Sequence, residues 1–228
     1  MPLNAATLAR EFATLVGNDR VRPTLSHEAA FTSVVVEPAQ ADEIGAIVRK
    51  CEQDRITLAP VGAARTVVQM RGAPVGIAVS LVRMNRVVAY DPADMTIIVE
   101  GGITLGAVNQ LTAAHGQRLP SDPPQPELTT VGALIASAKA GPLRLSEGTI
   151  RDLLIGIRFV GHDGRLIHAG GRVVKNVAGY DLMKVLTGSF GTLGIITEAA
   201  FKVRPIPPNY QLASATFATI DEAFAAAA

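Results

Sequence analysis

The sequence predicts an α+β protein built from two subdomains, and three features of the residue pattern lead to this prediction. Residues 32–59 contain a β-branched run, a run of helical periodicity and a second β-rich run, an order that is typical of a β-α-β unit. Residues 77–100 contain three further strand-like runs with no helical pattern between them. Residues 153–169 contain two apolar runs separated by an Asp163-Gly164 turn, which indicates an antiparallel hairpin.

Composition excludes several classes of protein. The chain has 228 residues, of which 48% are hydrophobic, so it can bury a sizeable core and is not disordered as a whole. Its 21 basic and 20 acidic residues nearly balance, which gives no electrostatic footprint for nucleic acid or an anionic membrane. No apolar run is long enough for a transmembrane segment, and no signal peptide precedes the first elements. We therefore expect a cytoplasmic protein without a nucleic-acid partner.

The first half of the chain begins with a short amphipathic helix over residues 8–16. A strand over residues 32–36 is followed by a helix over residues 39–53, whose apolar residues recur at the spacing of one helical face. A second strand covers residues 56–59. The turn over residues 60–66 then follows the carboxyl end of that strand, where α/β proteins commonly bind ligands.

The second half is expected to contain several strands and short helices. Strands are expected over residues 77–81, 87–90, 96–100, 153–160, 166–169, 194–203 and 211–217. Helices are expected over residues 104–115, 130–140 and 180–187 and from residue 220 onward. Between the first two of these helices, four prolines in residues 120–126 predict a fixed, extended loop.

Several common types of site are absent from the sequence. The glycines do not form the dinucleotide-binding or P-loop patterns. The four histidines are scattered and lack metal-ligand spacing. The single cysteine, Cys51, lies on the apolar face of its helix, so we expect a core residue rather than a nucleophile or disulfide partner.

Two segments resemble the FAD-binding domain of the vanillyl-alcohol oxidase and p-cresol methylhydroxylase superfamily. Residues 170–207 read GGRVVKNVAGYDLMKVLTGSFGTLGIITEAAFKVRPIP, and residues 119–164 contain the proline loop and the small-residue helix. Within that superfamily, the chain is similar to the family of FAD-binding subunits of glycolate oxidase (glycolate dehydrogenase). The resemblance extends over about residues 30–208.

The resemblance implies a two-subdomain FAD-binding fold of the vanillyl-alcohol oxidase and p-cresol methylhydroxylase type. A helical lead over residues 1–29 precedes the first FAD-binding subdomain, a βαβ unit over residues 30–84. The second FAD-binding subdomain covers residues 85–208. Residues 209–228 are then expected to be the start of a C-terminal domain that is truncated or absent.

The resemblance also implies that FAD binds noncovalently between the two subdomains. Successive N–H groups of the turn over residues 60–66 would surround the pyrophosphate, and the start of the helix at residue 130 would add its dipole. The cofactor-binding residues predicted in this way are Pro60, Gly62, Ala63, Ala64, Arg65, Thr66, Pro120, Ser121, Asp122, Thr130, Val131, Gly132, Ala136, Ser137, Ala140, Gly141, Gly148, Ile150, Asp152, Gly194, Ile195 and Ile196.

Four alanines distinguish the chain from the family pattern. Ala133 follows Gly132 where the family has a pair of glycines. Ala63 and Ala64 stand where the pyrophosphate turn usually has glycine, and Ala138 stands where an asparagine is usual near the flavin. A Cβ atom restricts the positive-φ conformations that such a turn can use. We therefore expect weak or substoichiometric FAD, with Arg65 as a compensating charge for the phosphates.

The function implied by the resemblance is that of an FAD-binding subunit in a 2-hydroxy-acid oxidoreductase complex of the glycolate or D-lactate type. Its partners would be a larger catalytic flavoprotein subunit and an iron–sulfur subunit. Catalytic residues are not identified: Arg144, Arg151, Lys175 and Tyr180 could face the flavin or be ordinary surface residues. Two alternatives stay open, a flavin-fold subunit that has lost FAD and acts as a structural partner, and the flavin subunit of a molybdenum hydroxylase.

Overall fold

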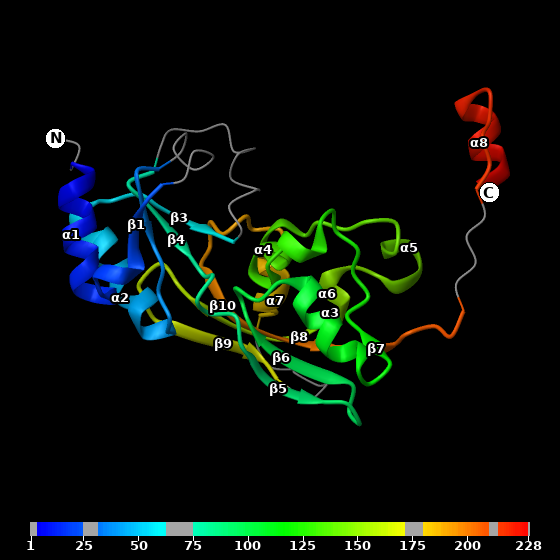
Figure 1. Cartoon of the computed structure of the whole chain (residues 1–228), viewed down its shortest axis with the longest axis horizontal. Helices are drawn as coiled ribbons and strands as arrows, with labels where there is room; N and C mark the ends of the chain where they lie inside the picture. Colours follow the sequence, from blue (N-terminus) through cyan, green and yellow to red (C-terminus); the bar gives the residue numbers. More distant parts are fainter. Residues whose placement is uncertain (1–3, 25–31, 63–74, 172–179, 210–213, 228) are drawn as a thin grey trace.

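The computed structural model describes residues 4–24, 32–62, 75–171, 180–209 and 214–227. These residues form two main β-sheets with helices packed against them, which confirms the expected α+β fold class. Figure 1 shows the two sheets side by side, with the amino-terminal helices at one end of the molecule and α8 separate from the rest.

The first sheet has four strands in the order β1-β2-β4-β3. Its elements, with the helices that accompany them, are α1 (Ala5–Val16), a 3-10 turn (Asn18–Arg20), β1 (Val21–Pro23), β2 (Val34–Val36), α2 (Ala41–Asp54), β3 (Leu58–Val61) and β4 (Ile77–Ser80). Strands β2 and β3 each pair in parallel with β4, which lies between them, whereas β1 is antiparallel to β2. The β-α-β unit is thus present, with a later strand inserted between its two strands.

The second sheet has five antiparallel strands in the order β5-β6-β10-β8-β9. Its strands are β5 (Val87–Asp91), β6 (Thr96–Glu100), β8 (Leu154–Val160), β9 (Leu166–Gly170) and β10 (Ile195–Lys202). Strands β8 and β9 form the hairpin expected from the Asp163-Gly164 turn, in which Gly164 has a φ of +73°.

Helices cover one side of the five-stranded sheet (Figure 1). They are α3 (Leu105–Ala113), α4 (Val131–Ser137), α6 (Ile150–Leu153) and α7 (Leu182–Leu186). The core between these helices and the sheet contains the fully buried side chains of Ile97, Leu134, Ile157 and Phe201. Burial of this apolar surface is the main force that holds the helices on the sheet.

Short elements complete the described part of the chain. They are β7 (Gln117–Arg118), a 3-10 turn (Pro126–Leu128), α5 (Arg144–Glu147), β11 (Arg204–Pro205) and α8 (Ile220–Ala227). Strands β7 and β11 pair with each other. The strand expected over residues 211–217 is wrong for residues 214–217, which form no strand, and residues 210–213 lie outside the described residues.

The two sheets are joined by a direct contact between α2 and the β8–β9 turn. Arg49 Nη1 donates a hydrogen bond to the carbonyl oxygen of Gly164 at 2.8 Å. A Cβ atom on Gly45 would lie 2.6 Å from the same oxygen, so this approach requires glycine at position 45. Val160 and Ile195, at the ends of β8 and β10, belong to the core beneath α1 and α2. The expected subdomain boundaries stay a prediction, although the first sheet uses residues up to 80 and the second begins at residue 87.

The described residues contain neither a membrane-spanning helix nor a cluster of metal-binding side chains. None of the helices there is long and apolar enough to cross a membrane. In the same part of the chain, no group of three or more His, Cys, Asp and Glu side chains could hold a metal ion.

Candidate cofactor-binding site

The carboxyl end of β3 lies against segments of the second subdomain. A Cβ atom on Gly62 would fall 2.3 Å from Oγ1 of Thr130, at the start of α4. A Cβ atom on Gly191 would fall 2.5 Å from Cγ of Pro60. Three segments therefore meet where the two subdomains adjoin: the end of β3, helix α4 and the loop before β10. A substitution at Gly62 would disturb this junction before it affected any ligand.

The first turn of α4 is fixed by hydrogen bonds within the chain. Val131 N–H donates to Ile103 O and Gly132 N–H donates to Gly101 O, each at 2.8 Å. Thr130 Oγ1 accepts from Ala133 N–H at 3.4 Å. The amide groups of Val131, Gly132 and Ala133 are therefore already in use within the chain.

The last turn of α4 holds the loop before β10. Ile135 O accepts from Gly188 N–H at 3.0 Å, and Ala136 O accepts from Phe190 N–H at 2.8 Å. The helix ends at Ala138, which has a left-handed conformation with φ 50° and ψ 28°. The hydroxyl of Ser137 donates to Ala133 O at 2.7 Å and is therefore engaged within the helix.

The loop before β10 has an unusual backbone and an exposed aromatic side chain. Gly188, Phe190 and Gly191 all have positive φ, between 53° and 80°. The Phe190 side chain is 53% exposed although its backbone is tied to α4. Neither Phe190 nor Ala138 is among the cofactor-binding residues predicted from the sequence.

The proline loop is tied to the segment that follows α4. The carboxylate of Asp122 accepts hydrogen bonds from Gly141 N–H and Leu143 N–H, each at 3.1 Å. The structure therefore brings together the predicted residues 120–122 and 140–141, in addition to the junction of residues 60–62 with α4.

The predicted residues between 148 and 152 build the start of α6. Asp152 Oδ2 accepts from the N–H of Thr149 at 2.8 Å and from its hydroxyl at 2.7 Å. These bonds lower the pKa of Asp152. Gly148 provides the positive φ of +82° before the helix, and the side chain of Ile150 is buried in the core. Local structure thus accounts for all three residues.

The predicted residues at the start of β10 also face the protein interior. Ile195 and Ile196 are buried, each in one of the two main cores. A Cβ atom on Gly194 would lie 2.8 Å from Cδ2 of Phe159 and 2.8 Å from Val160 O. Any cofactor contact here would involve the backbone.

Other predicted residues lie outside the described residues or on the surface. Ala63, Ala64, Arg65 and Thr66 are outside the described residues, as is Lys175. Arg144 and Arg151 are exposed, and Tyr180 is 93% exposed. Of the two alternatives, facing the flavin or lying on the surface, the exposure of these three side chains agrees with the surface.

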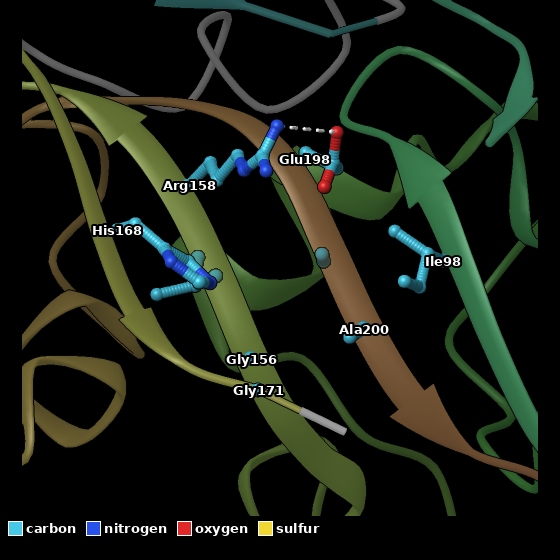
Figure 2. A pocket seen from close by; sticks show the side chains of 9 residues that line it. Ile98, Gly156, Arg158, His168, Gly171, Glu198 and Ala200 are labelled. Atoms are coloured by element: carbon cyan, nitrogen blue, oxygen red, sulfur yellow. Dashed lines mark ion pairs between the residues drawn. The ribbon is translucent and has the colours of Figure 1, made fainter. Parts of the chain in front are cut away.

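A separate pocket lies on the opposite side of the five-stranded sheet. It has a volume of about 180 Å³ and includes Ile98, Gly156 and Ala200 among its lining residues. Figure 2 shows Arg158 and His168 beside it, with Arg158 Nη1 3.6 Å from Glu198 Oε2. None of the predicted cofactor-binding residues lines this pocket.

Described residues of the expected site meet at the boundary between the subdomains. Segments from both subdomains converge there with glycine at the points of contact, and the space that a Cβ atom would take at Gly62, Gly141 and Gly191 is filled by the facing segment. The exposed Phe190 offers an apolar surface beside them. Residues 63–66, which were expected to surround a pyrophosphate, lie outside the described residues, so the part of the expected site that the structure describes is the junction of β3, α4 and the loop before β10.

Comparison with known proteins gives one family match. The family model described as "FAD binding domain" matches residues 32–170. The solved structure of an alkyldihydroxyacetonephosphate synthase aligns with a TM-score of 0.76 at 22% identity, covering 91% of this chain and 42% of the synthase. At that identity the likeness shows the fold alone.

Curated relatives are oxidoreductase subunits or dehydrogenases by name. Glycolate oxidase subunit GlcE of Escherichia coli (strain K12) is 41% identical over 128 residues, which is 55% of this chain and 37% of the relative. Glycolate oxidase subunit GlcD of Bacillus subtilis (strain 168) is 33% identical over 190 residues, 83% of this chain and 40% of the relative. A mitochondrial D-lactate dehydrogenase [cytochrome] of Arabidopsis thaliana is 32% identical over 191 residues, 83% of this chain and 33% of the relative. The chain thus spans well under half the length of each.

Proposed function

The chain belongs to the family of FAD-binding domains, with FAD as its cofactor, and from this membership we propose that it is the flavin-binding part of an oxidoreductase acting on a 2-hydroxy acid. Glycolate and D-lactate, in the names of the relatives above, are both 2-hydroxy acids. The observation that carries the proposal is the convergence of β3, α4 and the loop before β10 at the boundary between the subdomains.

In this proposal, the backbone segments of both subdomains bind and orient FAD. Residues 60–62 and the dipole of α4 would face its phosphates. Residues 136–141 and Phe190 would lie nearer its ring system. When bound, FAD supplies the chemistry by accepting a hydride from the substrate carbon. The protein would position the cofactor and exclude water from it.

The substrate-binding groups are proposed to come from outside residues 30–208. Oxidation of a 2-hydroxy acid needs a base for the hydroxyl proton and a cation for the carboxylate. Arg144, Arg151 and Tyr180 are exposed and are not held towards one another by any described contact. We further propose that residues 209–228 begin a C-terminal domain, because Ile220 and Phe224 on α8 are 72% and 70% exposed.

The proposed partners are a larger catalytic flavoprotein subunit and an iron–sulfur subunit. Support comes from the two relatives that are named as subunits of glycolate oxidase. The exposed apolar side chains of Val185, Phe190 and Leu193 would suit contact with another protein surface or with the cofactor.

A second candidate is a structural subunit that has lost FAD. It is favoured by Ala63 and Ala64, which replace glycines of the family's turn, and by Ala133 and Ala138, which replace a glycine and an asparagine of the family's second flavin segment. Nothing in the described residues favours the flavin subunit of a molybdenum hydroxylase.

Flavin content separates these candidates. We expect the purified chain to hold substoichiometric FAD and to take up more when FAD is added, as measured by its visible absorption spectrum and by equilibrium titration. An absence of binding at any FAD concentration would support the structural candidate. Tight, stoichiometric flavin in the purified chain would show that Ala63 and Ala64 do not weaken binding.

A further inference from the structure

We propose that Asp122 is a positioning residue that fixes residues 141–143 for cofactor binding, an inference that rests on the proposed FAD site. The carboxylate uses both oxygens for this purpose. Oδ1 accepts from Gly141 N–H and Oδ2 accepts from Leu143 N–H, each at 3.1 Å. Hydrogen bonds to a charged acceptor are stronger than those between neutral groups, so this pair is a strong constraint on the segment.

The proline loop and the segment after α4 pack closely against each other. A Cβ atom on Gly141 would lie 2.3 Å from Asp122 O and 2.5 Å from Oδ2. Real Cβ atoms do not approach oxygen so closely, so the contact depends on glycine at position 141. The segment after α4 therefore lies directly on the proline loop.

The proline loop is a rigid support for this carboxylate. Pro120, Pro123 and Pro124 have fixed φ angles on both sides of Asp122. Leu119 is fully buried, and its N–H donates to Asn109 Oδ1 of α3 at 2.8 Å. Ser121 N–H donates to Leu119 O at 2.8 Å. The position of Asp122 is thus set by α3 and the core, independently of the segment that it holds.

Residues 141–143 follow directly on the end of α4. The chain reaches them from Ala138, where a Cβ atom on Gly188 would lie 3.8 Å from the Ala138 side chain. It continues through Ala140 and Gly141, which are expected to approach the flavin. Loss of the Asp122 hydrogen bonds would release this backbone, so its effect on FAD would be indirect.

The test compares Asp122→Asn with a matched variant, Asp91→Asn. The amide retains one acceptor oxygen but places an NH₂ donor against the second N–H. Asp91 is the control because its Oδ1 also accepts two backbone N–H groups, those of Ala93 at 3.1 Å and Asp94 at 3.2 Å, in the β5–β6 turn. That turn contains none of the predicted cofactor-binding residues.

We expect Asp122→Asn to raise the FAD dissociation constant by about tenfold, whereas Asp91→Asn leaves it unchanged. In protein without FAD, hydrogen exchange at the amides of Gly141 and Leu143 should accelerate in Asp122→Asn only. Equal dissociation constants for the wild type and Asp122→Asn, or equal weakening by both variants, would overturn the proposal.

Two further outcomes are distinguishable. If the wild type binds no FAD, the proposed function fails, and the exchange measurement still decides whether Asp122 fixes the segment. If Asp122→Asn does not fold, Asp122→Glu replaces it, because it keeps the charge but moves the oxygens by one methylene. A raised dissociation constant for Asp122→Glu would support the positioning role, and a wild-type value would contradict it.

Discussion

Ala138 shows how one residue can hold a conformation that its side chain disfavours. Its left-handed φ of 50° ends α4 at the place where the chain must turn towards residues 141–143. An L-residue with a Cβ atom is strained there by about 1–2 kcal/mol, whereas glycine is not. The surrounding hydrogen bonds to Ile135 O and Ala136 O keep the turn in place despite this cost.

We therefore expect Ala138→Gly to raise the free energy of unfolding by about 0.5–1 kcal/mol, because relief of strain exceeds the added entropy of the unfolded chain. Urea denaturation would measure this change. The control is Ala136→Gly two residues earlier, inside the same helix, where the same substitution should lower stability by about 1 kcal/mol. A loss of stability in both variants would contradict the assigned strain.

Cys51 is a second residue whose environment decides its chemistry. Burial raises the pKa of the Cys51 thiol to about 12, since the thiolate would lose its hydration. The thiol should therefore stay protonated at pH 8 and fail to react with iodoacetamide in the folded protein. It should react only after unfolding in denaturant.

The same shift predicts a dependence of stability on pH. The unfolded chain releases the thiol proton near its ordinary pKa, whereas the folded chain retains it, so stability should fall as the pH rises from about 9 towards 12. Cys51→Ala should lose that part of the dependence. Rapid alkylation of the native wild type at pH 8 would show that the thiol is accessible after all.

At the scale of elements, the short helix α6 depends on its capping box. Asp152 accepts both the N–H and the hydroxyl of Thr149, which lowers the pKa of the carboxyl group. Its contribution is present above the unfolded pKa of about 4 and is lost as the pH falls through the lower folded pKa. Asp152→Ala should cost about 1 kcal/mol at pH 7. Urea denaturation should show the difference between wild type and variant shrinking at pH 2–3, and a constant difference would contradict this account.

The loop before β10 makes the junction with β3 sensitive to a single methyl group. Gly191→Ala would strain a φ of +77° and place Cβ 2.5 Å from Cγ of Pro60. We expect a loss of at least about 1–2 kcal/mol of stability and weaker FAD binding. Gly171→Ala is the control, because a Cβ atom there meets no atom of the described residues within 4 Å. Thermal unfolding and FAD titration of both variants would test this, and equal behaviour would contradict the proposed junction.

Elements with a clear local pattern of residues can be predicted from the sequence. Short strands that form only because they pair with a distant segment cannot. Helix α2 and the β8–β9 hairpin follow from an apolar stripe and an Asp-Gly turn. Strands β7 and β11 have two residues each, too few for any periodicity. Residues 214–217 have a strand-like composition but form no strand, which agrees with the dependence of strand formation on a partner rather than on composition.

At the scale of the molecule, the cofactor-binding segments can be predicted because their residues resemble those of a known family. The structure brings only some of these segments together. The positions of Gly62, Gly141 and Gly191 are contacts between segments far apart in the sequence. Contacts between distant segments leave no pattern in the local sequence. For the same reason, the sequence does not distinguish Phe190, which lies next to Gly191, from an ordinary loop residue. The family pattern also predicts Ile150 and Asp152 as cofactor-binding residues. In the structure, Ile150 is buried in the core and Asp152 caps the start of α6.

The distribution of exposed apolar side chains bears on the activity of the isolated chain. Helix α8 lies apart from both sheets (Figure 1), and Phe217, Ile220 and Phe224 near or within it are 40–72% exposed. Apolar side chains in such a row usually pack against another domain or subunit. The exposed side chains of Arg144, Arg151 and Tyr180 are not held together by any described contact. We therefore propose that residues 30–208 form the cofactor site, whereas another domain or a partner subunit supplies the groups that bind the substrate.

We therefore expect the FAD-loaded chain alone to oxidise glycolate or D-lactate at least about 100-fold more slowly than the same chain with its partner subunits, because a misplaced base and carboxylate clamp forfeit the contribution of orientation. A dye-reduction assay with both substrates, with and without the partners, would measure this ratio. Reduction of the bound flavin by dithionite is the control, since it reports a functional flavin without a substrate pocket. Comparable rates for the isolated chain and the complex would mean that residues 1–228 contain a complete substrate site, with Arg144 and Arg151 as the first cations to replace.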